Sequence, residues 1–138
     1  TRIELKDMTE YLLDTWAWIE FYTGSEKGEK IYQILESDEK CYTSIISLAE
    51  LSDNFHSGNL ESDHSWDQIR KFVEAKTKII KLDPETCGTA GKTKKKERKK
   101  HSDISLMDTI ILAQTREKEL KIITGDKHLQ NRKETAEI

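Results

Sequence analysis

The sequence has little proline and cysteine and no long apolar run, and each shortage excludes a class of protein. One of its 138 residues is proline, and only Cys41 and Cys87 are cysteine. Without a C-x-x-C pair, neither a disulfide framework nor a zinc site has support, and we expect two reduced thiols. No apolar run approaches the roughly 20 residues of a membrane-spanning helix, and the first residues lack a signal-peptide pattern. We therefore expect no membrane contact and a cytoplasmic location.

Charged residues are abundant by contrast, and they are unevenly spread. They make up 36% of the chain, against 35% hydrophobic residues, yet the formal net charge is only −3. The run Lys92–Lys100 (KTKKKERKK) holds seven cations and one anion, whereas the first forty residues are rich in Asp and Glu. A basic patch on a mildly acidic protein indicates an anionic partner, although a solvated helix face is an equally good interpretation.

Short apolar runs alternate with helical patterns along the chain. Four runs predict strands and a fifth could add an edge strand: 11–14, 40–43, 77–82, 121–124 and 135–138. Apolar spacing and capping residues predict helices over 15–22, from Ser25, over 44–55, from Ser62 or Asp63, over 84–92 and from Ser105, with a turn or short helix at 127–132. Parallel neighbours need crossover connections. We expect one domain over residues 1–138, an α/β/α three-layer sandwich with a twisted, mainly parallel sheet of four to five strands.

Four acids recur at matching places in this pattern. Asp14 follows the first strand, Glu50 lies in the helix after the second, Asp108 lies in the first turn of a helix, and Asp126 follows the fourth strand. Each alone can be explained as a cap, capping-box or turn residue. Because parallel strands end at one edge of a sheet, however, the four should share a crevice there.

Converging carboxylates predict a metal-dependent hydrolytic site. They repel one another and raise each other's pKa, a cost that a hard cation such as Mg²⁺ or Mn²⁺ removes. Such an ion can make a bound water nucleophilic and stabilise the charge of an attacked phosphodiester.

The same segments resemble the PIN-domain ribonucleases, and in particular the VapC-type toxins of toxin–antitoxin pairs. YLLDTWAWIEF is similar to the family's opening strand, TSIISLAEL to its glutamate-bearing helix, and ISLMDTIILAQTREKELKIITGDKHL to its most distinctive segment. The resemblance implies a catalytic, metal-binding acidic quartet and two supporting hydroxyls: Asp14, Glu50, Asp108 and Asp126, with Thr15 and Thr124.

From this resemblance we expect a Mg²⁺- or Mn²⁺-dependent endoribonuclease that cleaves single-stranded RNA by a metal-activated water. It also implies a homodimer and a small antitoxin partner that covers the acid crevice. The basic run adds possible RNA contacts at Lys94, Lys95, Lys96 and Arg98.

Other functions compete with this interpretation. An rRNA-processing PIN nuclease and a catalytically idle PIN-fold RNA-binding or assembly protein remain as alternatives. A phosphatase of the haloacid dehalogenase type is less suitable, because it needs an acid two residues after Asp14, where this chain has Trp16. A receiver-like signalling module would need paired acids at the first strand, and the strand end offers only Asp14.

Overall fold

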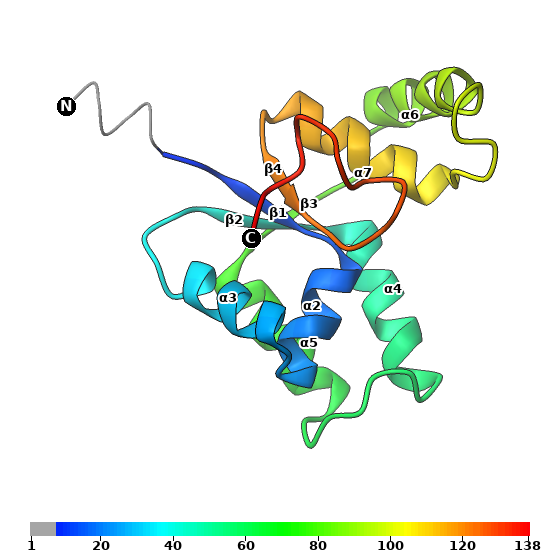
Figure 1. The fold of residues 1–138 in the computed structure, drawn as a ribbon. Helices are drawn as coiled ribbons and strands as arrows, with labels where there is room; N and C mark the ends of the chain where they lie inside the picture. The colour runs from blue at the N-terminus through cyan, green and yellow to red at the C-terminus, as the bar shows by residue number, and fades with distance from the viewer. Residues whose placement is uncertain (1–7) are drawn as a thin grey trace.

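In the computed structural model, which describes residues 8–138, a parallel sheet lies between two layers of helices (Figure 1). The strands are β1 (Tyr11–Leu13), β2 (Cys41–Ser44), β3 (Lys78–Ile80) and β4 (Lys121–Ile123), in the order β3-β2-β1-β4. The helices are α2 (Thr15–Thr23), α3 (Glu26–Leu35), α4 (Ile45–His56), α5 (Trp66–Lys76), α6 (Pro84–Glu97) and α7 (Leu106–Glu117). The expected three-layer α/β/α sandwich is confirmed.

Alternation along β1 separates the two layers. Leu13 points into a core shared with α2, α3, α4 and α5, whereas Leu12 packs with α7 residues such as Leu112 on the other face. Helix α6 packs along α7 and therefore lies on the outside of that second layer. The two helices run antiparallel, since Thr86 near the start of α6 donates to Glu117 at the end of α7 at 2.8 Å.

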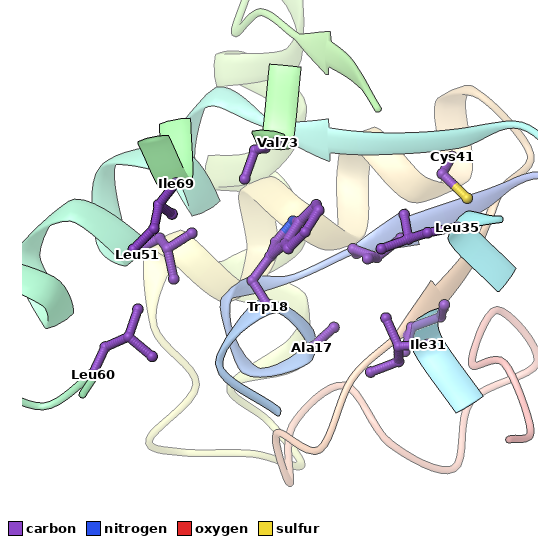
Figure 2. Packing of buried hydrophobic residues seen from close by; sticks show 11 residues of the cluster. Ala17, Trp18, Ile31, Leu35, Cys41, Leu51, Leu60, Ile69 and Val73 are labelled. Atoms are coloured by element: carbon purple, nitrogen blue, oxygen red, sulfur yellow. The ribbon is translucent and has the colours of Figure 1, made fainter. Parts of the chain in front are cut away.

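The first core is built around Trp18, at the centre of Figure 2. Its indole is fully buried, and its Nε1 donates to the hydroxyl of Thr43 at 3.0 Å. Helices α2 and α3 approach closely at Gly28, because a Cβ there would collide with the carbonyl of Glu20. The described residues contain no helix with the length and apolarity that a membrane crossing requires.

Two expected helix boundaries and one expected strand differ most from the structure. Helix α5 starts after Ser65 instead of Ser62 or Asp63, because Gln68 completes a capping box with Ser65. Helix α6 continues beyond residue 92 to Glu97, so most of the basic run is helical.

The possible edge strand at 135–138 is reduced to one parallel bridge between Thr135 and Ile122. Thr135 bonds back to the preceding turn, with its N–H on the carbonyl of Arg132 at 3.0 Å and its hydroxyl on that of Leu129 at 2.5 Å. The bridge to β4 is made by the neighbouring backbone groups, since the N–H of Ile122 donates to the carbonyl of Glu134 at 2.7 Å and the N–H of Ala136 donates to that of Ile122 at 2.8 Å.

Candidate functional site

The four acids come from elements that converge on the carboxyl edge of the sheet. Asp14 directly follows β1, and Asp126 follows β4, the parallel neighbour of β1, with Leu13 opposite Ile123. Asp108 lies in the first turn of α7, and Glu50 lies within α4. Asp126 and Glu50 both raise the pKa of Asp14, and Asp108 and Asp126 both raise that of Glu50. The four carboxylates therefore form one electrostatic group.

Asp14 is the most deeply buried of the four, with only 6% of its surface exposed. Burial is the main reason that its pKa rises to about 7, and repulsion by Asp126 and Glu50 adds to the shift. The hydroxyl of Thr124 and the backbone N–H of Ala17, which donates to Oδ1 at 2.9 Å, act against it. Close to neutral pH this carboxyl is thus divided between its two protonation states.

Glu50 is half-buried, and its pKa is raised first by that burial. The hydroxyl of Thr15 donates to its Oε1 at 3.1 Å, which favours the ionised form. Repulsion by Asp108, Asp126 and the exposed Asp53 raises the pKa further. Thr15 therefore joins the first turn of α2 to the acid on α4.

Asp126 and Asp108 are both held by their own backbone surroundings. The Oδ1 of Asp126 accepts the N–H of His128 at 2.8 Å, and the N–H of Asp126 donates to the hydroxyl of Thr124 at 3.0 Å. Asp108 forms a reciprocal capping box with Ser105, at 3.2 Å and 3.1 Å. Their turn and cap roles are real, and they do not prevent a role in the site.

The donor set suits a hard divalent cation. All four groups are carboxylates. Glu50, Asp108 and Asp126 each accept a hydrogen bond at one of their two oxygens, whereas Asp14 is bonded by the N–H of Ala17 at Oδ1 and also by the hydroxyl of Thr124. The charged groups that shift the pKa values of Asp14 and Glu50 are all acids.

The side chains are not drawn together as a ready-made ligand shell. Among residues 8–138, no three His, Cys, Asp or Glu side chains stand close enough to hold an ion directly. Mg²⁺ usually keeps several waters and is bound through one or two carboxylates. The acids therefore fit an ion that some of them contact directly and others through water.

A single peptide group, between Ile104 and Ser105, connects Asp108 to the basic run. The sequence did not reveal this connection. The guanidinium of Arg98 donates to the carbonyl of Ile104 from Nε at 3.2 Å and from Nη2 at 3.0 Å. The N–H of the same peptide, on Ser105, donates to the carboxylate of Asp108. No local pattern marks such a contact, because Arg98 lies outside the capping motif.

Asp103 ties the α6–α7 loop to the turn that carries Asp126. It pairs with the ammonium of Lys127 at 3.0 Å and lies 3.3 Å from Nε2 of His128. The contact joins His128 to a residue 25 positions earlier in the sequence, so no local pattern could indicate it. Of the expected RNA contacts, Lys95 and Lys96 are exposed and Lys94 is half-buried.

Large apolar side chains are exposed beside two of the acids. Ile45 in the first turn of α4 is 38% exposed, and Leu106 and Met107 in the first turn of α7 are 46% and 45% exposed. We refer to Ile45, Leu106 and Met107 as the apolar rim.

Solved structures from several bacteria have the same fold. A toxin–antitoxin complex from Klebsiella pneumoniae matches with a TM-score of 0.70 and 19% identity, covering 92% of this chain and 96% of that one. VapBC2 from Rickettsia felis, bound to a DNA fragment from its promoter, matches with a TM-score of 0.66 and 14% identity, covering 92% of this chain and 96% of that one. VapC20 from Mycobacterium tuberculosis, a toxin that cleaves the sarcin-ricin loop, matches with a TM-score of 0.60 and 13% identity, covering 84% of this chain and 91% of that one.

The sequence itself also identifies the family. No curated protein matches it. The family model for the PIN domain matches residues 11–134, a range that contains the four acids and the strands and helices that position them. The chain therefore belongs to the PIN-domain family.

Proposed function

We propose that this protein is a Mg²⁺- or Mn²⁺-dependent endoribonuclease that cleaves single-stranded RNA. The observation that carries the proposal is Asp14, a buried acid at the end of an inner strand, with a pKa raised to about 7 by burial and by repulsion from Asp126 and Glu50. Such a group destabilises the fold when ionised, and a divalent cation removes that cost.

The four acids and two threonine hydroxyls have distinct roles in this proposed function. Asp14, Glu50, Asp108 and Asp126 would hold the ion, which supplies a Lewis acid for the phosphodiester oxygen and lowers the pKa of a bound water. Thr15 orients Glu50 through its 3.1 Å hydrogen bond. Thr124 lowers the pKa of Asp14 and accepts the N–H of Asp126, so it steadies the two acids that follow β1 and β4.

The protein is further proposed to be the toxin of a toxin–antitoxin pair, acting on RNA in the cytoplasm. Membership of the PIN family and a fold like that of toxin–antitoxin complexes support this role. The apolar rim supports a protein partner at the crevice, because exposed apolar side chains beside a polar site are typical of interaction surfaces. A small antitoxin is the proposed partner there, and a homodimer is the proposed assembly.

Cleavage assays with defined ions test the function. The purified protein should cut single-stranded RNA with Mg²⁺ or Mn²⁺ and stop when EDTA is added. Asp14→Asn should reduce the rate by roughly 100-fold or more, because a neutral amide is a poor ligand for a hard cation. Asp38→Asn is the matched control, since Asp38 is exposed in the loop before β2, at the other edge of the sheet.

Two results would contradict the proposal. Equal rates with EDTA and with metal would refute the role of the ion. RNA binding without cleavage by either ion would instead favour a PIN-fold RNA-binding or assembly protein.

A further inference from the structure

One face of the C-terminal half of α6 consists of lysines. Lys92, Lys95 and Lys96 lie on the helix, Lys99 follows in the turn directly after it, and all four are exposed. Their spacing of three, four and seven residues places them on one side of a helix. Thr86 and Ala90, which are buried, lie on the other side. We call Lys92, Lys95, Lys96 and Lys99 the basic face.

Acids among residues 8–138 do not neutralise the basic face. Within residues 8–138, none of its lysines has an acidic side chain within 4.0 Å. Glu97, the acid inside the run, pairs with Arg132 at 2.8 Å. On α5, by contrast, Lys71 and Lys76 both pair with carboxylates at 3.0 Å. Four like charges on one helix face repel one another, and a polyanion would remove that repulsion.

The basic face ends next to the candidate site. Arg98 holds the carbonyl of Ile104, and the N–H of the same peptide group binds Asp108. The antiparallel packing of α6 on α7 brings the end of one helix to the start of the other (Figure 1). The lysines therefore continue from the acid edge of the molecule without an intervening element.

The negative charge of the four acids and the positive charge of the basic face would have opposite effects on an approaching nucleic acid. Acids at the crevice repel an approaching phosphate backbone, so a nucleic acid substrate needs cations close by to be held there. From Lys92 to Lys99 the helix and turn extend roughly 10 Å, at 1.5 Å per residue, which is enough for more than one phosphate of an extended strand. Lysine ammonium groups bind phosphates as point charges and require no particular base order.

We propose that the basic face binds the phosphate backbone of the RNA substrate beside the cleaved bond and so guides the strand into the acid crevice. The identity of the strand rests on the proposed ribonuclease function, whereas the basic face itself rests on the positions of the lysines. Arg98 uses Nε and Nη2 for the carbonyl of Ile104, so the basic face is defined by the four lysines alone.

RNA binding without cleavage is the appropriate test. The full chain is titrated with a short fluorescent single-stranded RNA in EDTA, between about 50 and 200 mM salt. Lys95→Gln/Lys96→Gln/Lys99→Gln should weaken binding and reduce the slope of log K against log salt by about 2, since each phosphate contact on a single strand contributes about 0.7. The matched control is Lys30→Gln/Lys40→Gln/Lys78→Gln, which removes the same charge from exposed lysines on α3 and at the amino ends of β2 and β3.

The outcomes separate this inference from the function on which it rests. A reduced slope in the first variant alone, with unchanged thermal unfolding, would support the basic face. Equal slopes for the two variants would overturn it. A parallel titration with duplex DNA would also overturn it if the first variant lost DNA binding but kept the RNA binding of the parent. Absence of cleavage by the parent protein would refute the nuclease function but leave this metal-free measurement intact.

Discussion

At the scale of the residue, each acid can combine its structural role with the proposed metal-binding role, because a carboxylate has two oxygens. Asp14 caps α2 through Oδ1, Asp108 closes a capping box, and Asp126 accepts a turn N–H. Each bond fixes the position of the side chain, and for Asp108 and Asp126 it occupies one of the two oxygens. The ordinary explanation for each acid therefore does not exclude its part in the site, and it supplies the rigidity that a metal site needs.

The buried carboxyl of Asp14 should make the metal-free protein less stable as pH rises. Its pKa is 3.8 in the unfolded reference and about 7 when folded, so between these values only the unfolded state loses the proton. The contribution of Asp14 to the free energy of unfolding is therefore fully present below pH 3.8, declines between pH 3.8 and about 7, and is constant above about 7. At 1.36 kcal/mol per pKa unit, the loss amounts to a few kcal/mol.

Urea unfolding in EDTA at about pH 5 and pH 8 measures this effect. The free energy of unfolding of the parent should fall between the two conditions by more than that of Asp14→Asn, which cannot titrate there. Asp38→Asn should follow the parent, because Asp38 is exposed. If Asp14→Asn lost as much stability as the parent, the carboxyl would not titrate in this window.

At the scale of the element, contacts between distant segments are the part that sequence patterns do not contain. Trp16 near the start of α2 packs on Gly125, the residue directly before Asp126, so closely that a Cβ on Gly125 would run into the indole ring. Gly125→Ala should therefore cost about 1 to 3 kcal/mol of unfolding free energy through overpacking. Thermal or urea unfolding checks this value.

Helix α6 provides the matched control for that substitution. Gly88 is exposed on α6, and nothing lies within 4 Å of a Cβ added there. Gly88→Ala should leave stability unchanged or raise it by up to about 1 kcal/mol, because alanine is the better helix former. A neutral Gly125→Ala would show that the indole moves aside freely and does not fix the turn before Asp126.

Local patterns predicted most of the elements for physical reasons that act within a few residues. The four strands are short apolar runs between polar turns, and the order of elements placed the four acids at one edge. The start of α5 was misplaced because three candidate caps lie close together and only the Ser65 box is completed by Gln68. Glycines obscured the length of α6, whose packing on α7 offsets their low helix propensity.

The remaining features depend on residues that the fold brings together. Trp18 is fully buried, because its ring packs against Phe72 of α5, which lies far away in the sequence. The bond from Arg98 to the peptide that holds Asp108 and the contact of Asp103 with His128 have the same origin. Helical periodicity cannot reveal them.

At the scale of the whole molecule, a net charge of −3 conceals two opposed surfaces. The acids gather at the carboxyl edge of the sheet, and the basic face follows α6 away from it. Each surface contains like charges that repel in the isolated protein. Ligands of opposite sign would relieve this repulsion, and on our proposals they are a cation at the four acids and an anionic strand at the basic face.

Metal binding tests the crevice in the intact molecule without an RNA substrate. An ion that binds only the folded state stabilises it by mass action, by about 2.7 kcal/mol at 100 times the dissociation constant. For a domain of this size, Mn²⁺ should therefore raise the melting temperature by several degrees. The shift should shrink below about pH 7, since a proton on Asp14 competes with the ion.

Asp108→Asn distinguishes the ligand role of this residue from its cap role. Asparagine is a poorer ligand for a hard cation, yet its amide oxygen can still accept the Ser105 N–H that the carboxylate now accepts at 3.2 Å. The variant should be at least as stable as the parent without metal, because one repelling charge near Glu50 is gone, and it should lose most of the Mn²⁺ shift. Asp38→Asn should retain the full shift. If Asp108→Asn also retained it, Asp108 would serve only to start α7, and the ion would be held by Asp14, Glu50 and Asp126.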